Sequence, residues 1–283
     1  MGIIVGLLNA FSTAFTSVFL KKLSGTSPNF LTWVRVASAL PALLIIVAVF
    51  VPWSLPQKEF WALVIFVITP LEIALAWLGT RALQLSPISI IAPLASLTSI
   101  FLIPVGFLIL GELPTLLGFG GVLAIVLGSF LIGHRGGEPF MRGLKNVFKE
   151  KGSYLASAGA FLASVAISVT KVSFAYAPPL LSALYINLVL AIVLLPFLFI
   201  QSPEPLRKHS KALAGVGLTA GLGTALHFIG LALLPAVYYI SIKRLSVVID
   251  VFLGRVFFHE DHIRERFFGA VLMFAGIVLI AVG

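Results

Sequence analysis

The sequence contains no cysteine, and only 10% of its 283 residues are charged. Without cysteine the chain can form no disulfide, no thiol nucleophile and no cysteine-ligated metal site. Soluble domains carry about 25% charged residues, so this chain lacks the charge needed to cover a water-facing surface. Acids are scarcer than bases, with 10 Asp and Glu against 19 Lys and Arg.

Apolar residues make up most of the remainder. The chain is 60% hydrophobic and has a mean hydropathy of +1.13. One soluble core cannot bury this excess, so the composition predicts an all-α polytopic membrane protein. The opening MGIIVGLLNAF has no basic region and leads into a full-length apolar stretch. We therefore expect a retained first helix there, not a cleaved signal peptide.

Ten segments are long and apolar enough to be membrane-spanning helices, each of roughly 20 residues. Turn and charge clusters such as KKLSGTSPN and GELP separate them. The segments lie near residues 2–20, 29–51, 60–82, 88–110, 114–133, 153–177, 180–200, 212–234, 236–257 and 266–283.

The two halves of the chain resemble each other. The alignment has no gaps between residues 83–112 and residues 231–260, and it continues into the next apolar segment. The matched pairs, each 148 residues apart, are Pro87 with Pro235, Gly106 with Gly254, Glu112 with Glu260, Gly121 with Gly269, and Gly128 with Gly276. Five helices per repeat, an odd number, invert the second copy in the membrane. We therefore predict a first repeat over 1–135, a basic connection over 136–152 and a second repeat over 153–283.

This pattern resembles the EamA domains of the drug/metabolite transporter superfamily. The similarity rests on the five-plus-five helices, on a P…P…GE stretch ending at Glu112 and on a P…HE stretch ending at Glu260. It covers nearly the whole chain. It implies a secondary transporter that moves a small metabolite, such as a nucleotide sugar or phosphorylated sugar, by alternating access. It does not identify the substrate.

Polar side chains occur at one depth in four of the predicted spans. Lys243 and Arg244 lie roughly 10–12 Å below the nearer end of the ninth span, at about 1.5 Å per residue. Asn9, Asn187 and His227 lie at a similar level. A deep charge costs about 2.5–3.5 kcal/mol, and this grouping is typical of a site for an anionic or strongly polar ligand. We predict that Lys243 and Arg244 hold the ligand and that Asn187 and His227 orient it.

Two further residues are candidates for the same pathway. Asn9 would contribute its amide, and Tyr239 would line the pathway. Both have a structural alternative, because Asn side chains often bind neighbouring helices and Tyr is common near membrane interfaces. For His227 and Asn187, too, interhelical hydrogen bonding is the alternative.

Two acids lie near mid-membrane, Glu72 in the third span and Asp250 in the ninth. Asp250 follows Lys243 by seven residues, which would put both on one helix face. They lie roughly 10 Å apart along the axis, too far for a close pair. We expect Glu72 to neutralise Arg244 when no substrate is bound, or Glu72 or Asp250 to exchange protons as a coupling group. A purely structural ion pair is the alternative for all four charges.

A closer resemblance exists to the plastid phosphate translocators of this superfamily, which use a Lys-Arg pair in the ninth helix to hold substrate phosphate. Lys243 and Arg244 are similar in type and place. Those proteins add a lysine from the fourth helix, whereas residues 88–110 here contain no Lys or Arg. The repeat equivalents of the pair are Ala95 and Ser96. The resemblance therefore implies an anionic or polar metabolite without specifying phosphate.

Other function classes have weaker support in the sequence. No P-loop is present, so ATP is not expected to drive transport directly, and we expect no metal or other cofactor. The rivals are an integral membrane enzyme and a non-transporting membrane scaffold. The five histidines, at positions 134, 209, 227, 259 and 262, form no convincing ligand set for an enzyme, and a scaffold leaves the deep cations unexplained. Glu112 and Glu260 precede helices and are expected to stabilise helix N-termini.

The basic residues predict the orientation in the cell (cytoplasmic) membrane. The connections after the odd-numbered spans hold Lys21, Lys22, Arg81, Arg135, Arg142, Lys145, Lys149, Lys151, Arg207, Lys208, Lys211, Arg264 and Arg266. The opposite side holds Lys58 and Lys171. The positive-inside rule then places residues 135–152 in the cytoplasm and both termini outside, although the superfamily resemblance implies cytoplasmic termini. The positive charge thus reflects topology and contact with the lipid bilayer, with no nucleic-acid partner expected.

Overall fold

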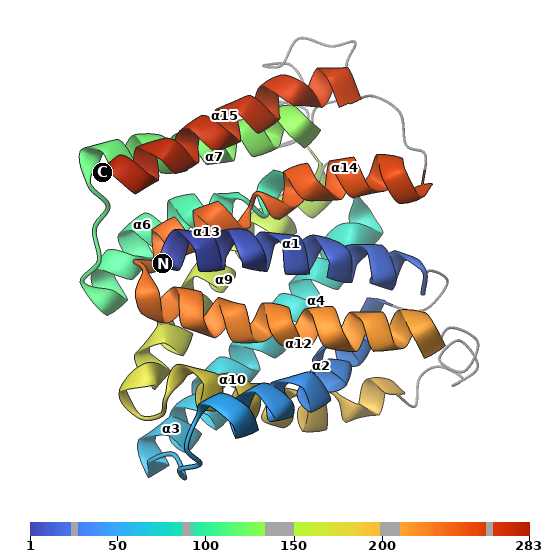
Figure 1. Cartoon of the computed structure of the whole chain (residues 1–283), viewed down its shortest axis with the longest axis vertical. Coiled ribbons are helices and arrows are strands. Elements are labelled where there is room, and N and C mark those ends of the chain that lie inside the picture. Colours follow the sequence, from blue (N-terminus) through green and yellow to red (C-terminus); the bar gives the residue numbers. More distant parts are fainter. Residues whose placement is uncertain (24–27, 87–90, 92, 134–149, 199–209, 259–262) are drawn as a thin grey trace. The chain divides into compact units, whose positions relative to one another are not determined.

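The computed structural model describes residues 1–23, 28–86, 91, 93–133, 150–198, 210–258 and 263–283, and every regular element in these ranges is a helix (Figure 1). In chain order they are α1 (Gly2–Lys21), α2 (Pro28–Phe50), α3 (Lys58–Leu63), η1 (Val64–Ile68), α4 (Thr69–Leu85), α6 (Leu97–Leu110), α7 (Leu116–Gly133), α9 (Lys151–Val172), η2 (Ser173–Ala175), α10 (Pro179–Val193), η3 (Leu195–Leu198), α12 (Ser210–Leu233), α13 (Ala236–Lys243), α14 (Ser246–Phe258) and α15 (Ile263–Val282). These elements form ten helical segments in this part of the chain when α3, η1 and α4, α9 and η2, α10 and η3, and α13 and α14 are each counted as one segment. This confirms the predicted ten-helix fold.

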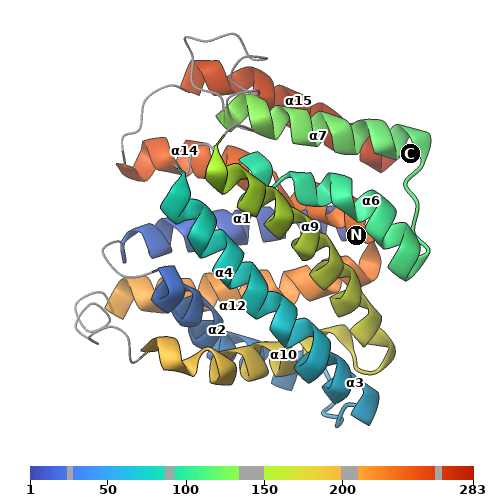
Figure 2. The ribbon, with the colours of Figure 1, turned by 180° about the vertical axis from the view of Figure 1, so that it is seen from behind.

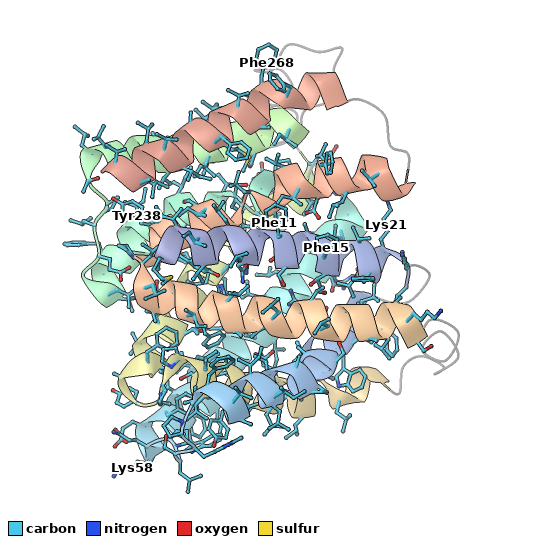
Figure 3. The ribbon with its side chains drawn as sticks, viewed as in Figure 1. Phe11, Phe15, Lys21, Lys58, Tyr238 and Phe268 are labelled. Carbon is cyan, nitrogen blue, oxygen red and sulfur yellow. The ribbon has the colours of Figure 1, made fainter. Side chains whose placement is uncertain are left out.

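The helices have the length and surface of membrane spans. Among the described residues, five helices are long and apolar enough to cross a bilayer, and the shorter apolar helices include α6, α7 and α10. Large apolar side chains face outward, as Phe11 and Phe15 of α1 and Phe268 of α15 illustrate (Figure 3). A soluble surface rarely exposes apolar side chains so densely. The protein is therefore a multi-pass membrane protein.

The helices gather into two compact units that differ from the sequence repeats. Unit 1 comprises Met1–Pro70 and Thr170–Leu233, and unit 2 comprises Leu71–Val169 and Leu234–Gly283. Each unit thus contains segments from both halves of the chain. The boundaries fall inside two long helices, at Pro70 in the third segment and before Thr170 in the sixth.

The third segment contains a π-helical turn, which Pro70 explains. In η1 the Thr69 N–H donates to Val64 O, one residue farther back than in an α-helix. Pro70 has no N–H to continue the ordinary pattern, and such wide turns commonly accommodate a proline in a long helix. Helix α4 then continues from this turn.

Unit 1 packs α12 against α1, α2 and α10. A polar ladder joins α1 to α12, in which the Ser12 hydroxyl donates to Thr219 O at 2.6 Å and the Thr16 hydroxyl donates to Thr219 Oγ1 at 2.9 Å. On the side facing α2, a Cβ added to Gly217 would lie 2.6 Å from Ser38 O. The glycine-rich sequence of α12 therefore permits close helix packing.

Unit 2 is built around the antiparallel pair α7 and α15, which lie side by side in both views (Figures 1 and 2). A Cβ at Gly121 would lie 2.5 Å from Gly276 O, and one at Gly128 would lie 2.6 Å from Gly269 O. Gly121 and Gly269 are repeat equivalents, as are Gly128 and Gly276. The repeat relationship thus exchanges the two contacts, as an inverted repeat requires.

Candidate functional site

The ninth segment is interrupted at the predicted ligand-binding pair. Helix α13 ends at Lys243 and α14 begins at Ser246, whereas the sequence predicted a single span over 236–257. Arg244 has φ −62° and ψ −14°. Leu245 N–H donates to Ile242 O at 3.0 Å, three residues back, so the chain tightens locally towards a 3₁₀ geometry. Discontinuous helices of this kind form the substrate sites of many inverted-repeat transporters.

The first repeat is interrupted at the equivalent residue. Ser96, which precedes Arg244 by 148 residues, has φ −70° and ψ −20° and stands directly before α6. Its N–H donates to Pro93 O at 3.0 Å, again three residues back. The backbone break is therefore a property of the repeat, while the side chains placed on it differ.

Those side chains meet different surroundings. The Ser96 and Ser129 hydroxyls form a buried hydrogen bond, with each residue about 1% exposed. In the second repeat Arg244 and Ile277 stand at these two positions. The Arg244 Nε atom is buried and has no hydrogen-bond partner within the described part of the chain. A buried N–H without an acceptor is costly, so this donor is suited to an acceptor that a ligand brings.

The other predicted residues of the ninth segment lie on either side of the break. Tyr239 is fully buried on α13, and Lys243 is half-buried. Asp250 is half-buried on α14. The seven-residue spacing no longer places Lys243 and Asp250 on one face, because that inference required an uninterrupted helix. The role of Tyr239 in the pathway stays a prediction.

Glu72 lies in the first turn of α4, two residues after Pro70, and is half-buried. It belongs to unit 2, as do Lys243, Arg244 and Asp250. All four deep charges predicted from the sequence are thus assigned to the same compact unit. Their pairing, and a role in proton coupling, stay predictions.

Asn9 and His227 come together in unit 1. The Asn9 amide donates to Gly223 O on α12, and its side-chain oxygen accepts from the Thr13 hydroxyl at 3.3 Å. Asn9 is fully buried. Gly223 and His227 are one turn apart on α12, so Asn9 lies beside the turn that carries His227. These contacts give Asn9 a packing role, and its substrate role stays a prediction.

Asn187 and His227 make local contacts. The Asn187 amide donates to Ala183 O, one turn back on α10, at 2.9 Å. The His227 ring meets the Phe228 ring edge-on, with centroids 5.8 Å apart. Both residues belong to unit 1, so their common level with Lys243 and Arg244 remains a sequence-based prediction.

Glu112 acts at the N-terminus of a helix that is distant from it in the sequence. Its Oε2 accepts the Ala236 N–H, the first of α13, at 2.7 Å. Tyr238 accepts the Thr115 N–H at 2.7 Å. Sequence reasoning identified Ser96 as the repeat equivalent of Arg244 but did not predict its bond to Ser129, and it gave Tyr238 no positioning role. Glu260 lies outside the described residues.

In the described part of the chain, no three His, Asp or Glu side chains lie close enough together to hold a metal ion. Four of the five histidines, at positions 134, 209, 259 and 262, fall outside it.

Ten helical segments, an inverted repeat and interrupted helices in both halves define a polytopic membrane protein of the inverted-repeat class. The sequence profile of the EamA-like transporter family matches the chain twice, over residues 1–133 and 150–282. The chain belongs to this family, which confirms the predicted resemblance to the drug/metabolite transporter superfamily. A solved structure titled "Crystal structure of protein" has the same fold, with a TM-score of 0.79 and 16% identity over 99% of this chain and 98% of that chain. The comparison with curated proteins found no match.

Proposed function

We propose that this protein is a secondary transporter that carries a small polar metabolite, preferably an anion, across the cytoplasmic membrane by alternating access. One observation carries the proposal: Lys243 and Arg244 stand at the interruption between α13 and α14. Interrupted helices offer backbone groups that no helix uses, and transporters place substrates there. Two fixed cations at that point favour a negatively charged substrate group.

The two cations would act differently. Arg244 presents a planar guanidinium that matches carboxylate or phosphate oxygens, and its Nε–H has no acceptor among the described residues. Lys243 contributes a compact charge on a flexible stem. Tyr239, in the same unit, would orient the rest of the substrate through its hydroxyl group. The substrate roles of Asn187, His227 and Asn9 stay sequence-based predictions.

A carboxyl group would couple transport to protons. Glu72 and Asp250 are the candidates, since both are half-buried and belong to the same unit as the cation pair. A carboxylate that neutralises Arg244 in the absence of substrate would take up a proton when a substrate anion replaces it. Glu72→Gln and Asp250→Asn separate the two candidates. If the replaced carboxyl group couples transport to protons, its variant loses flux driven by a pH gradient but keeps substrate exchange. Unaltered gradient-driven flux in both variants contradicts proton coupling.

The test of the function begins with a thermal-shift screen of purified protein against dicarboxylates, sugar phosphates, neutral sugars and cationic amines. The best ligand is then measured in liposome flux. The double variant Lys243→Ala, Arg244→Ala is expected to lose flux by roughly tenfold to hundredfold, as the loss of charged hydrogen bonds implies. Arg81→Ala is the matched control, because Arg81 is exposed and bonds Gln84 of its own helix. Ligands confined to cationic amines, or normal flux in the double variant, would disprove the anion site.

A further inference from the structure

Helix α13 depends on outside contacts for its orientation. It has eight residues, about two turns, and the interruption after Lys243 removes the support of a continuous span. It packs against α6 and α7 within unit 2. The position of Lys243 and Arg244 at the C-terminal end of α13 therefore depends on the contacts that hold its N-terminal end.

Glu112 holds that beginning. The first N–H groups of a helix have no acceptor inside the helix, and Pro235, which precedes α13, offers no side-chain acceptor. Glu112 Oε2 accepts the Ala236 N–H at 2.7 Å. A carboxylate there makes a charge-assisted hydrogen bond and also faces the positive end of the helix dipole.

The chain reversal before Glu112 aims its side chain. Helix α6 ends at Leu110 and is capped by Gly111, whose φ of +70° is left-handed. Gly111 N–H donates to Phe107 O at 3.0 Å and Glu112 N–H donates to Gly106 O at 3.2 Å. This is the pattern of a helix end that closes on a left-handed glycine, and other residues adopt that conformation only at a cost. Gly111 thus sets the backbone turn that directs the Glu112 side chain towards α13.

Tyr238 makes the return contact. Its hydroxyl accepts the Thr115 N–H, just before α7, at 2.7 Å, and lies 3.3 Å from Thr115 Oγ1. Tyr238 also packs so closely on Gly118 that any side chain at Gly118 would overlap it. Figure 3 shows Tyr238 beside the connection that leads to α7. The α6–α7 connection and α13 therefore each satisfy an N–H group of the other.

The tyrosine contact has no counterpart in the opposite repeat. The equivalents of Tyr238 and Thr115 are Ile90 and Ile263, which have no hydroxyl groups. The Tyr238–Thr115 contact is thus found only for α13, the helix that ends at the cation pair. This asymmetry argues for a purpose beyond general packing.

We propose that Glu112 and Tyr238 are positioning residues that hold α13 on the α6–α7 connection and thereby fix the orientation of Lys243 and Arg244. The proposal rests on the proposed function, in which this pair holds the substrate. Neither positioning residue touches the substrate. Both act through the backbone of α13.

The experiment compares Glu112→Gln and Tyr238→Phe with wild type, using purified full-length protein. Glu150→Gln and Tyr154→Phe are matched controls, because Glu150 accepts a hydrogen bond from Ser86 within the same unit and Tyr154 is 67% exposed. The first readout is hydrogen–deuterium exchange over residues 236–243. The second is the rate at which phenylglyoxal modifies Arg244, with Arg81 as the internal reference.

Each positioning variant is expected to speed exchange in residues 236–243 about tenfold, the factor expected for one lost hydrogen bond, and to change the Arg244 rate several-fold. Arg81 and both controls stay at wild-type values. Unchanged exchange or unchanged Arg244 reactivity overturns the proposal, and so does an equal change at Arg81, which indicates general loosening. If Glu112→Gln does not fold, Tyr238→Phe decides, since it removes a single oxygen atom.

A parallel arm separates this proposal from the proposed function. Succinate and inorganic phosphate are tested for protection of Arg244 against phenylglyoxal in the wild-type protein. Absence of protection by both ions counts against the anion site, whereas the exchange and reactivity readouts still decide the positioning role. Protection in wild type with the same apparent affinity in both positioning variants overturns the positioning role alone.

Discussion

Ser96 and Arg244 occupy equivalent positions in the two repeats and share one backbone conformation, but their side chains are satisfied differently. The ψ angles are −20° and −14°, and both residues stand at a helix interruption. Ser96 bonds the buried hydroxyl of Ser129, whereas the buried Nε of Arg244 has no partner in the described ranges. The helix interruption thus carries a buried structural hydrogen bond in the first repeat and, in the second, the Arg244 Nε–H donor, which is unpaired among the described residues.

The Ser96–Ser129 bond predicts energetic coupling between these residues. Ser96→Ala and Ser129→Ala should each lower the free energy of unfolding by about 0.5–1.5 kcal/mol, because each leaves one hydroxyl without its buried partner. The double variant should cost less than the sum of the two single changes. Thermal unfolding in detergent gives the three values. Strict additivity would show that the two hydroxyls contribute independently.

Replacing Arg244 is expected to abolish transport without lowering stability. Arg244→Ser introduces the residue that the same backbone carries in the first repeat, and it removes a buried donor without an acceptor. A buried donor without an acceptor costs free energy, so removing it is expected to be neutral or stabilising. We expect an unchanged or raised melting temperature together with loss of flux.

Arg81→Ser is the control for this change, since Arg81 is exposed and belongs to the same unit. It should alter neither melting temperature nor flux. A marked loss of stability in Arg244→Ser would instead assign Arg244 a structural role, in line with the ion-pair alternative.

The sequence predicted the ten helical segments and the repeat, because hydropathy and matched Pro, Gly and Glu positions report on these directly. It did not predict the helix interruptions, since hydropathy averages over a window far longer than one turn. Nor did it predict the partner of Glu112. Ala236 is 124 residues away, and a carboxylate next to its own helix start is the simpler reading of a sequence.

Little of the arrangement of the candidate residues could be predicted from the sequence, and their substrate roles stay predictions. Depth estimates from segment ends grouped Asn9 with His227, and the structure places Asn9 beside the turn of α12 that carries His227. The common face of Lys243 and Asp250 depended on an unbroken helix and does not follow. A helix break depends on backbone hydrogen bonding between α13 and α14, for which the side-chain pattern alone gives no signal.

The crossing of α7 and α15 predicts a steep sensitivity at Gly121. A methyl group there would lie 2.5 Å from Gly276 O and 2.8 Å from Ile280 Cγ1, so the helices must separate. Gly121→Ala is expected to cost about 1–3 kcal/mol or more, measured by thermal unfolding. Gly120→Ala is the matched control, because nothing lies within 4 Å of its added Cβ. Equal effects of the two changes would mean that the close crossing does not limit stability.

Replacing Asn9 is expected to lower stability, an effect that a role in substrate binding alone would not produce. Asn9→Ala removes the amide that donates to Gly223 O from a fully buried position, which should cost about 0.6–1.7 kcal/mol in a membrane protein. Ser17→Ala on the same helix is the control, because the exposed Ser17 hydroxyl bonds only its own helix. If Asn9→Ala raised KM without lowering the melting temperature, the predicted substrate role would be favoured over packing.

The orientation can be tested because the chain has no native cysteine. Thirteen basic residues follow the odd-numbered spans and two lie on the other side, so the positive-inside rule predicts that residue 54 faces outward and residue 84 faces the cytoplasm. Both side chains are exposed. A membrane-impermeant maleimide should label Ser54→Cys in intact cells and Gln84→Cys only after permeabilisation. The reverse pattern would favour the cytoplasmic termini that the superfamily resemblance implies, and would show that charge bias does not set the insertion of this chain.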